Sequence, residues 1–497
     1  MCLRSINMPP LQPQSVRPIG IYGVMRESEV DSYLTPDGAV KEVINFHFDR
    51  KGAATTRPGL TAIGATVSSG QSCIGLHNLQ SNTAIAVFVA TGSATIYELQ
   101  SGTWAQIGKG QGAGVLRFID FAQRTIVFGP AESSMKVFSG SNFSTTSGDP
   151  INPDDLWYVN GTTNAAYGRF QYGEVYKSRI YLSGENNYVP FASRLFFSSV
   201  ISSSGNISWS PSTDFVDINP ADGENITALK RFSLELLVFK ANYIYRFRTS
   251  GVDPDPLVKV GTRSQESVIE GKRGLYFHHD TGFYRYSGGY PEEISRPISD
   301  VVDAIPFSQY GSISSWKDND HIYWSVGDLT IAEPEGGKIW KNVVLRYTES
   351  SDVWTVYSYA HEITRGTPFI TGTSKSIMVG LESGVMAEFN KGLADTGEPI
   401  KYRIVTKWYE WEGIAARKMI SLMLAVMEKG AGASLMYQID DKDTWEVLSL
   451  SLEPFVTYLD KNTKKFHRIR FKVAGVTSYE SFVFLGLEIL QGVNEGI

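Results

Sequence analysis

The stretch LKRFSLELLVFKANYIYRFRTSG (229–251) carries the pattern that decides the fold of this chain. A short apolar strand is followed by a turn, and then by a second strand that carries aromatic residues. Alternation of apolar and polar residues is typical of a half-buried strand. The stretch KRGLYFHHDTGFYRYSGG (272–289) repeats the theme, with Thr281 and Gly282 at its turn. Both stretches therefore predict antiparallel hairpins.

The same theme recurs between residues 71 and 390, at uneven intervals of roughly 35–60 residues. This interval is typical of propeller blades of about four strands, and we count six or seven units. A tandem of unrelated β-sandwiches also gives short alternating strands. Because the hairpins recur without linkers between them, the sequence favours an irregular β-propeller of six to seven blades. One short helix is predicted at 299–305. Further units lie at 83–99, 117–140, 169–187, 314–328 and 367–392.

The two chain ends differ from these repeats. Residues 1–20 are rich in proline and glutamine, which predicts an extended arm without a core of its own. After Gly392 longer alternating strands follow; segment 416–429 has helical propensity, but its neighbours favour a strand. We therefore predict an all-β chain in which both ends form one platform domain. Its parts are an N-terminal arm with platform strands (1–65), the propeller (66–392) and a C-terminal β-rich platform domain (393–497).

Composition narrows the function classes. Of 497 residues 42% are hydrophobic, 12% aromatic and only 20% charged, and the formal net charge is −6. A general nucleic-acid binder carries a basic face, and the net negative charge of this chain argues against such a face. The two cysteines, Cys2 and Cys73, exclude a disulfide scaffold. No apolar run is long enough to span a bilayer and the start lacks a signal peptide, so we expect a soluble protein that folds in a cytoplasm.

Catalytic motifs are absent from the sequence. It contains no HExxH, GxSxG or GxxxxGK[ST] motif and no EF-hand loop. Some propellers are glycosidases, which need two carboxylates on either side of the sugar bond. The sequence gives no reason to pair any two of the candidate carboxylates. We therefore predict a protein that is not an enzyme, with no catalytic, cofactor-binding or metal residues. The candidate carboxylates are Asp120, Asp217, Glu266 and Glu292.

Potential metal ligands gather at one place, His278, His279 and Asp280. Consecutive residues of a strand point to opposite faces, whereas zinc needs convergent ligands. We interpret the pair of histidines as a blade edge before the turn that follows. Asp318 and Asp320 suit weak calcium binding, but a solvated hairpin turn is the favoured interpretation.

Aromatic hairpins and glycosylation sequons complete the set of candidate features. The alternation of the aromatics favours packing between blades over stacking on sugars or bases. Without a signal peptide we interpret the sequons as chance matches. The aromatics are Tyr243, Tyr245, Phe247, Phe283, Tyr284 and Tyr286, and the sequons begin at Asn142, Asn160, Asn206 and Asn225.

Three segments in order carry a family resemblance. RPGL (57–60) precedes the blades, GLYFHHDTGFYRYSGGYPEEISRPISDVVDAI (274–305) forms one of them, and HRIRFKV (467–473) lies in the late strand-rich part. This order resembles the packaged-DNA stabilization proteins, or tail nozzle and hub proteins, of short-tailed bacteriophages, over nearly the whole chain. The resemblance implies a propeller that decorates a platform made from both chain ends. It also implies six copies in a ring below the portal and adaptor, with a channel for DNA.

The function implied by the resemblance is structural. We expect a virion tail protein that extends the portal–adaptor channel, retains packaged DNA and conducts it during ejection. Its partners would be other copies in a hexameric ring, the portal, adaptor and other tail proteins, and transiently the DNA, without membrane insertion. It would reside in the host cytoplasm before assembly. A net-negative wall suits a conduit because it repels phosphate. The alternatives are a propeller-bearing receptor-binding adhesin with a sugar pocket, and a polysaccharide-degrading enzyme with convergent carboxylates.

Overall fold

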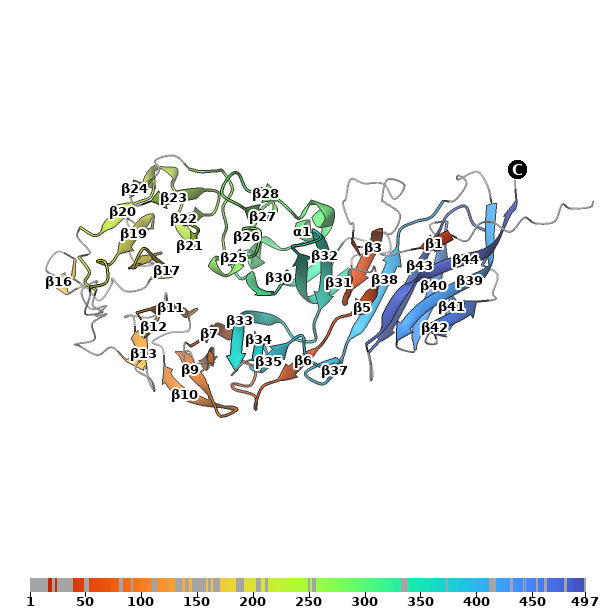
Figure 1. Cartoon of the computed structure of the whole chain (residues 1–497), viewed down its shortest axis with the longest axis horizontal. Coiled ribbons are helices and arrows are strands. Elements are labelled where there is room, and N and C mark those ends of the chain that lie inside the picture. The colour runs from red at the N-terminus through yellow and green to blue at the C-terminus, as the bar shows by residue number, and fades with distance from the viewer. Residues whose placement is uncertain are drawn as a thin grey trace, which may run out of the picture.

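The structure is a computed structural model with two lobes, a ring of small sheets and a pair of larger sheets (Figure 1). It describes residues 17–19, 23–24, 39–48, 53–79, 84–90, 93–109, 114–122, 124–129, 136–138, 143–144, 158–159, 162–163, 170–184, 192–202, 207–210, 213–248, 251–252, 256–331, 338–371, 374–410, 417–429, 432–440, 442, 444–452, 455–459, 463–477 and 481–495.

The ring consists of units of four antiparallel strands, which we call blades 1 to 7 in the order of their first strands. Blades 1 to 5 are separate sheets, whereas the sheets of blades 6 and 7 continue into further strands. Blade 1 consists of β7 (Cys73–Asn78), β8 (Ala84–Ala90), β9 (Ser93–Gln100) and β10 (Thr103–Lys109). Blade 2 consists of β11 (Arg117–Phe121), β12 (Arg124–Phe128), β13 (Lys136–Phe138) and β14 (Phe143–Ser144). Blade 3 consists of β17 (Tyr172–Tyr176), β18 (Arg179–Ser183), β19 (Arg194–Phe197) and β20 (Phe215–Asp217). A separate two-stranded pair, β15 (Tyr158–Val159) with β16 (Thr162–Thr163), lies between blades 2 and 3 in the chain.

Blades 4 to 6 continue the same strand order. Blade 4 consists of β21 (Ile226–Phe232), β22 (Glu235–Lys240), β23 (Ile244–Arg248) and β24 (Gly251–Val252). Blade 5 consists of β25 (Ile269–Glu270), β26 (Leu275–His279), β27 (Gly282–Tyr286) and β28 (Glu292–Glu293). Blade 6 consists of β29 (Ser314–Asp318), β30 (His321–Ile331), β31 (Lys338–Thr348) and β32 (Val353–Ser358).

Blade 7 is completed by a strand from the chain segment that precedes blade 1. Its first three strands are β33 (Ile363–Thr371), β34 (Ser374–Leu381) and β35 (Met386–Phe389). The fourth is β6 (Leu60–Ala62), which precedes blade 1 in the chain and pairs antiparallel with β35. Because β33 also lies against β7, blades 7 and 1 are neighbours in space. The sequence predicted six to seven blades, and the strand pairing of the described residues gives seven.

Each pair of neighbouring blades encloses an apolar cluster. Phe239 of blade 4 meets Phe277 of blade 5 edge to face, with ring centroids 5.3 Å apart. Tyr245 packs in the cluster between blades 3 and 4, beside Tyr181. Face-to-edge aromatic contacts of this kind add to the burial of apolar area. The aromatics singled out in the sequence lie in such clusters, which confirms their predicted role in packing: Tyr243, Tyr245 and Phe247 between blades 3 and 4, Tyr284 and Tyr286 between blades 4 and 5, and Phe283 in the core that runs into the platform.

The second lobe is a sandwich of two sheets, which we call the platform. One sheet continues blade 6 through a single parallel bridge between Ile44 and Val356. It contains β2 (Gly23–Val24), β3 (Ala39–Ile44), β38 (Lys401–Thr406), β43 (Ile469–Val476), β40 (Ala433–Ile439) and β41 (Glu446–Leu452). The other contains β1 (Arg17–Ile19), β4 (Phe46–Phe48), β5 (Ala54–Thr56), β44 (Val483–Glu495), β39 (Arg417–Lys429) and β42 (Phe455–Leu459).

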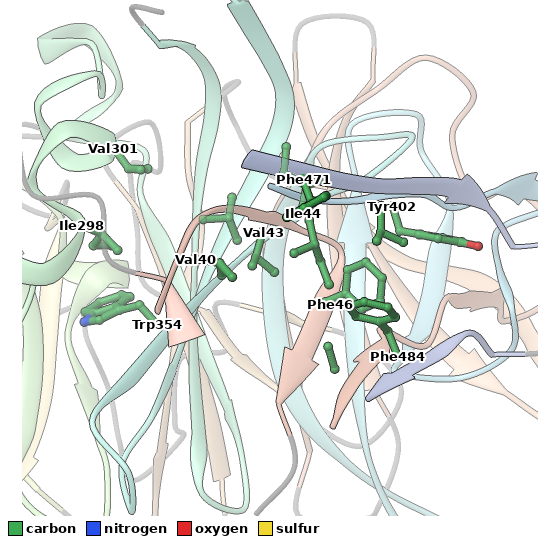
Figure 2. Packing of buried hydrophobic residues seen from close by; sticks show 14 of the residues in the cluster. Val40, Val43, Ile44, Phe46, Ile298, Val301, Trp354, Tyr402, Phe471 and Phe484 are labelled. Atoms are coloured by element: carbon green, nitrogen blue, oxygen red, sulfur yellow. The ribbon is translucent and has the colours of Figure 1, made fainter. Parts of the chain in front are cut away.

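One hydrophobic core runs from the propeller into the platform. Figure 2 shows Trp354 and Ile298 on the propeller side, Val43 of β3 in the middle, and Tyr402 and Phe484 on the platform side. Burial of apolar side chains is the dominant favourable term in folding. The two lobes therefore share a hydrophobic core.

Most sequence-based expectations agree with this architecture. The all-β fold is confirmed, and so is the strand at 416–429, which is β39 paired with β44. The predicted short helix is α1 (Ser299–Asp303), preceded by the 3₁₀ turn η5 (Arg296–Ile298). Of the segment 1–65, β1 to β5 lie in the platform sheets, but β6 lies in blade 7.

Some expectations fall outside the described residues. These are the arm at 1–20, apart from 17–19, Cys2, and the sequons at Asn142, Asn160 and Asn206. Within the described ranges, no helix is long and apolar enough to cross a membrane.

Candidate functional site

Polar residues from distant parts of the chain meet at several places in the fold, and two of these places are candidate sites. The first is a cavity of about 540 Å³ at the propeller axis, which we call the axial cavity. The first strands of blades 1, 2, 3, 4 and 7 line it, together with the 3₁₀ turn η4 (Gln265–Ser267). A cavity of this size can hold a small molecule. Its charged side chains are Arg117, Asp120, Glu174, Lys230, Arg231, Glu266 and Arg365, with His77 beside them.

The central ion pair of this cavity joins Arg117 of β11 to Glu266 of η4. The Arg117 Nε lies 2.7 Å from a Glu266 carboxylate oxygen, and the side chains are 16% and 17% exposed. Burial alone would raise the pKa of Glu266, but Arg117 and Arg365 outweigh it and hold the pKa below its usual value. Glu266 is therefore a carboxylate at neutral pH.

A second carboxylate, Asp120 of β11, is also held in its charged form. It accepts hydrogen bonds from the Thr125 hydroxyl at 2.7 Å and lies 3.0 Å from the Nε2 of His77. Burial would raise the pKa of Asp120, but the bonds with His77 and Thr125 lower it. A glycosidase needs one carboxyl group with a raised pKa as its acid. Neither Asp120 nor Glu266 offers that group at neutral pH.

The other two candidate carboxylates lie elsewhere, on the fourth strands of their blades. Asp217 of β20 pairs with Arg194 at 2.7 Å, and Glu292 of β28 pairs with Arg285 at 2.5 Å. Neither contributes to the wall of the axial cavity. The structure therefore brings Asp120 and Glu266 to one cavity and leaves the other two apart.

The histidine pair is part of the blade packing. His278 is 1% exposed and packs edge to face against Phe283 and Tyr310. Burial lowers the pKa of His278 to about 3, so its ring is neutral. Asp280 points instead to Arg263, with the Nη2 at 2.8 Å. Within the described ranges no three His, Cys, Asp or Glu side chains converge as a metal site.

In the hairpin turn at 317–320, Asp318 and Asp320 bind different partners. Asp318 accepts a bond from the amide of its neighbour Asn319 at 2.9 Å. Asp320 lies 3.4 Å from the Nζ of Lys272, and its pKa is lowered chiefly by a hydrogen bond with Ser350. The two aspartates therefore serve local turn contacts.

The second polar assembly is buried, and we call it the junction, because it lies where the platform meets blades 6 and 7. The Arg57 side chain is 0% exposed and its guanidinium binds Asp395 through two parallel bonds, 2.8 Å and 2.6 Å long. It also donates from Nε to Asn45 Oδ1 at 2.8 Å. The remaining two donors reach the carbonyls of Pro58 at 3.0 Å and Ser358 at 2.7 Å. All five guanidinium hydrogens therefore have partners.

The surroundings of Arg57 keep it charged. Burial would lower its pKa, but Tyr359 and Asp395 outweigh that effect and raise it. The guanidinium carbon lies 3.7 Å from the centroid of the Tyr359 ring. Arginine suits such a site because its planar fork matches a carboxylate and stacks on aromatic faces.

Asn45 joins the same assembly to two more strands. It adopts a left-handed backbone with φ of 63°, which asparagine tolerates better than most residues. Its amide donates to the carbonyl of Lys401 at 2.7 Å, and its Oδ1 accepts from the backbone N–H of Ser358 at 2.8 Å. Platform strand β38 and blade strand β32 are thus bonded to one side chain.

The RPGL segment has a structural role at each described position. Arg57 forms the junction, and Leu60 begins β6 and pairs with Phe389 of β35. At Gly59 an added Cβ would lie 2.0 Å from the carbonyl oxygen of Ala394, so only glycine fits. The sequence marked RPGL as a motif but gave no sign of Asn45 or Asp395 as its partners.

Comparisons with known proteins show only distant similarity. No protein-family model matches the chain, and no curated protein matches it. The Pan2 WD40 domain of Neurospora crassa is similar at 9% identity and a TM-score of 0.39, over 69% of this chain and 96% of that one. The extracellular domain of BT4673 from B. thetaiotaomicron is similar at 10% identity and a TM-score of 0.42, over 89% and 64%. The designed protein Ika8 is similar at 10% identity and a TM-score of 0.35, over 66% and 99%. With such low scores, the propeller assignment rests on the strand pairing of this chain.

Proposed function

We propose that the chain is a structural virion protein of the tail nozzle class. It would assemble into a hexameric ring, extend the portal–adaptor channel, retain packaged DNA and conduct it during genome ejection. The support is the segment order that resembles the packaged-DNA stabilization proteins, together with the way the two lobes are joined. The observation that carries the proposal is the junction, because one segment of that resemblance, RPGL, provides its buried arginine.

A rigid connection between lobes suits a ring subunit. A closed ring is built from heterologous contacts, in which one surface of each copy meets a different surface of the next. Such contacts close only if the two surfaces keep a fixed relation within each copy. The shared core and the Arg57–Asp395 pair supply that fixed relation here.

The proposal also implies the partners of the protein and its location. The ring would contact portal, adaptor and other tail proteins, and the DNA only transiently. The protein would be found in the tail of the virion, and in the host cytoplasm before assembly.

The test is the mass and shape of the purified full-length chain, alone and mixed with portal complexes. Light scattering and negative-stain imaging are expected to show a hexameric ring with a central hole, formed alone or on the portal. The Arg57→Ala variant is expected to give fewer closed rings, whereas Lys391→Ala, at an exposed pair, leaves ring formation unchanged. A monomer of 55.0 kDa that ignores every portal complex would refute the proposal.

A second candidate, a propeller-bearing receptor-binding protein, is favoured by the axial cavity. That cavity is the kind of pocket in which a propeller binds a ligand. A monomer that binds host cells would support this candidate, and turnover of polysaccharide would support an enzyme instead.

A further inference from the structure

The axial cavity holds more positive than negative charge. Arg117, Lys230, Arg231 and Arg365 face three carboxylates, those of Asp120, Glu174 and Glu266. One positive charge remains in excess when His77 is neutral, and two remain when it is protonated. The chain as a whole is net negative, so this cavity departs from the charge of the rest of the protein.

Each of the three carboxylates in the cavity already has a partner among the neighbouring side chains. Glu266 binds Arg117, and Glu174 lies 3.5 Å from the Nζ of Lys230. Asp120 binds His77 and the Thr125 hydroxyl. The excess positive charge therefore resides on the two remaining arginines.

Those two arginines have no carboxylate of their own within the part of the chain that the structure describes. Arg365 of β33 donates to the backbone carbonyl of Thr364 at 2.6 Å, and it acts on Glu266 and Glu362 only through longer-range attraction. Arg231 of β21 is exposed. Among the described residues, no acidic group lies within ion-pair distance of it. Guanidinium groups bind carboxylates and phosphates through paired hydrogen bonds.

We propose that the axial cavity is a binding site for a small anion that carries a carboxylate or a phosphate group, held by Arg231 and Arg365. The Arg117–Glu266 and Lys230–Glu174 pairs form its polar wall. Phe118, which stacks on His77 at 5.2 Å, and Ile119 supply an apolar part for the carbon skeleton of the ligand. The binding of this anion does not depend on ring assembly, so either proposal can fail without the other.

The experiment is a titration of the purified full-length chain with inorganic phosphate and, separately, with glucuronate, followed by calorimetry. One saturable site of millimolar or tighter affinity is expected for at least one of the two. Binding of phosphate alone points to a phosphorylated ligand, and binding of glucuronate alone points to an acidic sugar. Either result supports the site.

Matched variants locate the binding. Arg231→Gln and Arg365→Gln are each expected to weaken it about tenfold, because each removes a hydrogen bond to a charged group. Arg248→Gln removes the same charge from β23 of blade 4, outside the cavity, and is expected to bind like the unaltered chain. Thermal melting checks that each variant is folded. No saturable binding of either probe, or binding that survives both cavity variants, would overturn the proposal.

Discussion

The junction and the axial cavity each hold an arginine paired with a carboxylate. Arg57 lies 2.6 Å from Asp395, and Arg117 lies 2.7 Å from Glu266. Their surroundings differ. The junction pair is 0% and 4% exposed, whereas the cavity pair is 16% and 17% exposed.

This difference separates an almost fully buried pair from a partly exposed one. In the junction every donor of Arg57 meets a protein acceptor, although Asn45 and Asp395 also line a cavity of about 1180 Å³. In the axial cavity Arg117 shares its space with other charged groups and with solvent. Removing one partner of a fully buried pair leaves an uncompensated charge, while a partly exposed pair is screened by water.

The largest expected effect is therefore at the junction. Arg57→Ala leaves Asp395 buried without its cation and is expected to lower the free energy of unfolding by about 3–5 kcal/mol. Urea denaturation followed by far-UV circular dichroism measures it. Lys391→Ala, whose side chain is 58% exposed, is the matched control and should change stability by less than about 0.5 kcal/mol.

A double variant distinguishes the pair from the packing around it. Arg57→Met with Asp395→Leu removes both charges and keeps apolar volume, so it is expected to be more stable than Arg57→Ala alone. Equal losses in the single and double variants would contradict the role given to the buried charge.

The next effect concerns the close approach of the chain at Gly59. Gly59→Ala would place a methyl group 2.0 Å from the Ala394 carbonyl oxygen and is expected to cost about 1–3 kcal/mol. Gly289→Ala is the control, because nothing lies within 4 Å of an added Cβ there. Similar urea midpoints for the two variants would show that β6 and the segment at Ala394 can move apart freely.

The smallest effect is the pH dependence from the cavity pair. The pKa of Glu266 is lower in the folded chain than the ordinary value of 4.5. Its contribution is therefore present at neutral pH and is lost as the pH falls below 4.5 through the folded pKa. Glu266→Gln is expected to cost about 1 kcal/mol at neutral pH and less in acid. A stability difference that stays constant between neutral and acid conditions would contradict this pairing.

The elements that depend on a local sequence pattern could be predicted from the sequence. Hairpins such as 272–289 show their period and their turn within a few residues, and β39 was recognised from the strands around it. The junction was not predictable, because Arg57 and Asp395 lie 338 positions apart. Nor did any spacing connect Arg117 with Glu266, which lie 149 positions apart. The closing strand β6 was assigned to the platform because its partner β35 lies at the far end of the propeller.

The central claim is that the junction makes the propeller and the platform one rigid unit. Hydrogen exchange followed by mass spectrometry, at increasing urea, tests it directly through peptides from β32 and β38. The account predicts that both peptides open with the same free energy in the unaltered chain, and that Arg57→Ala lets them open separately. Separate opening in the unaltered chain, or joint opening that Arg57→Ala leaves intact, would contradict the account.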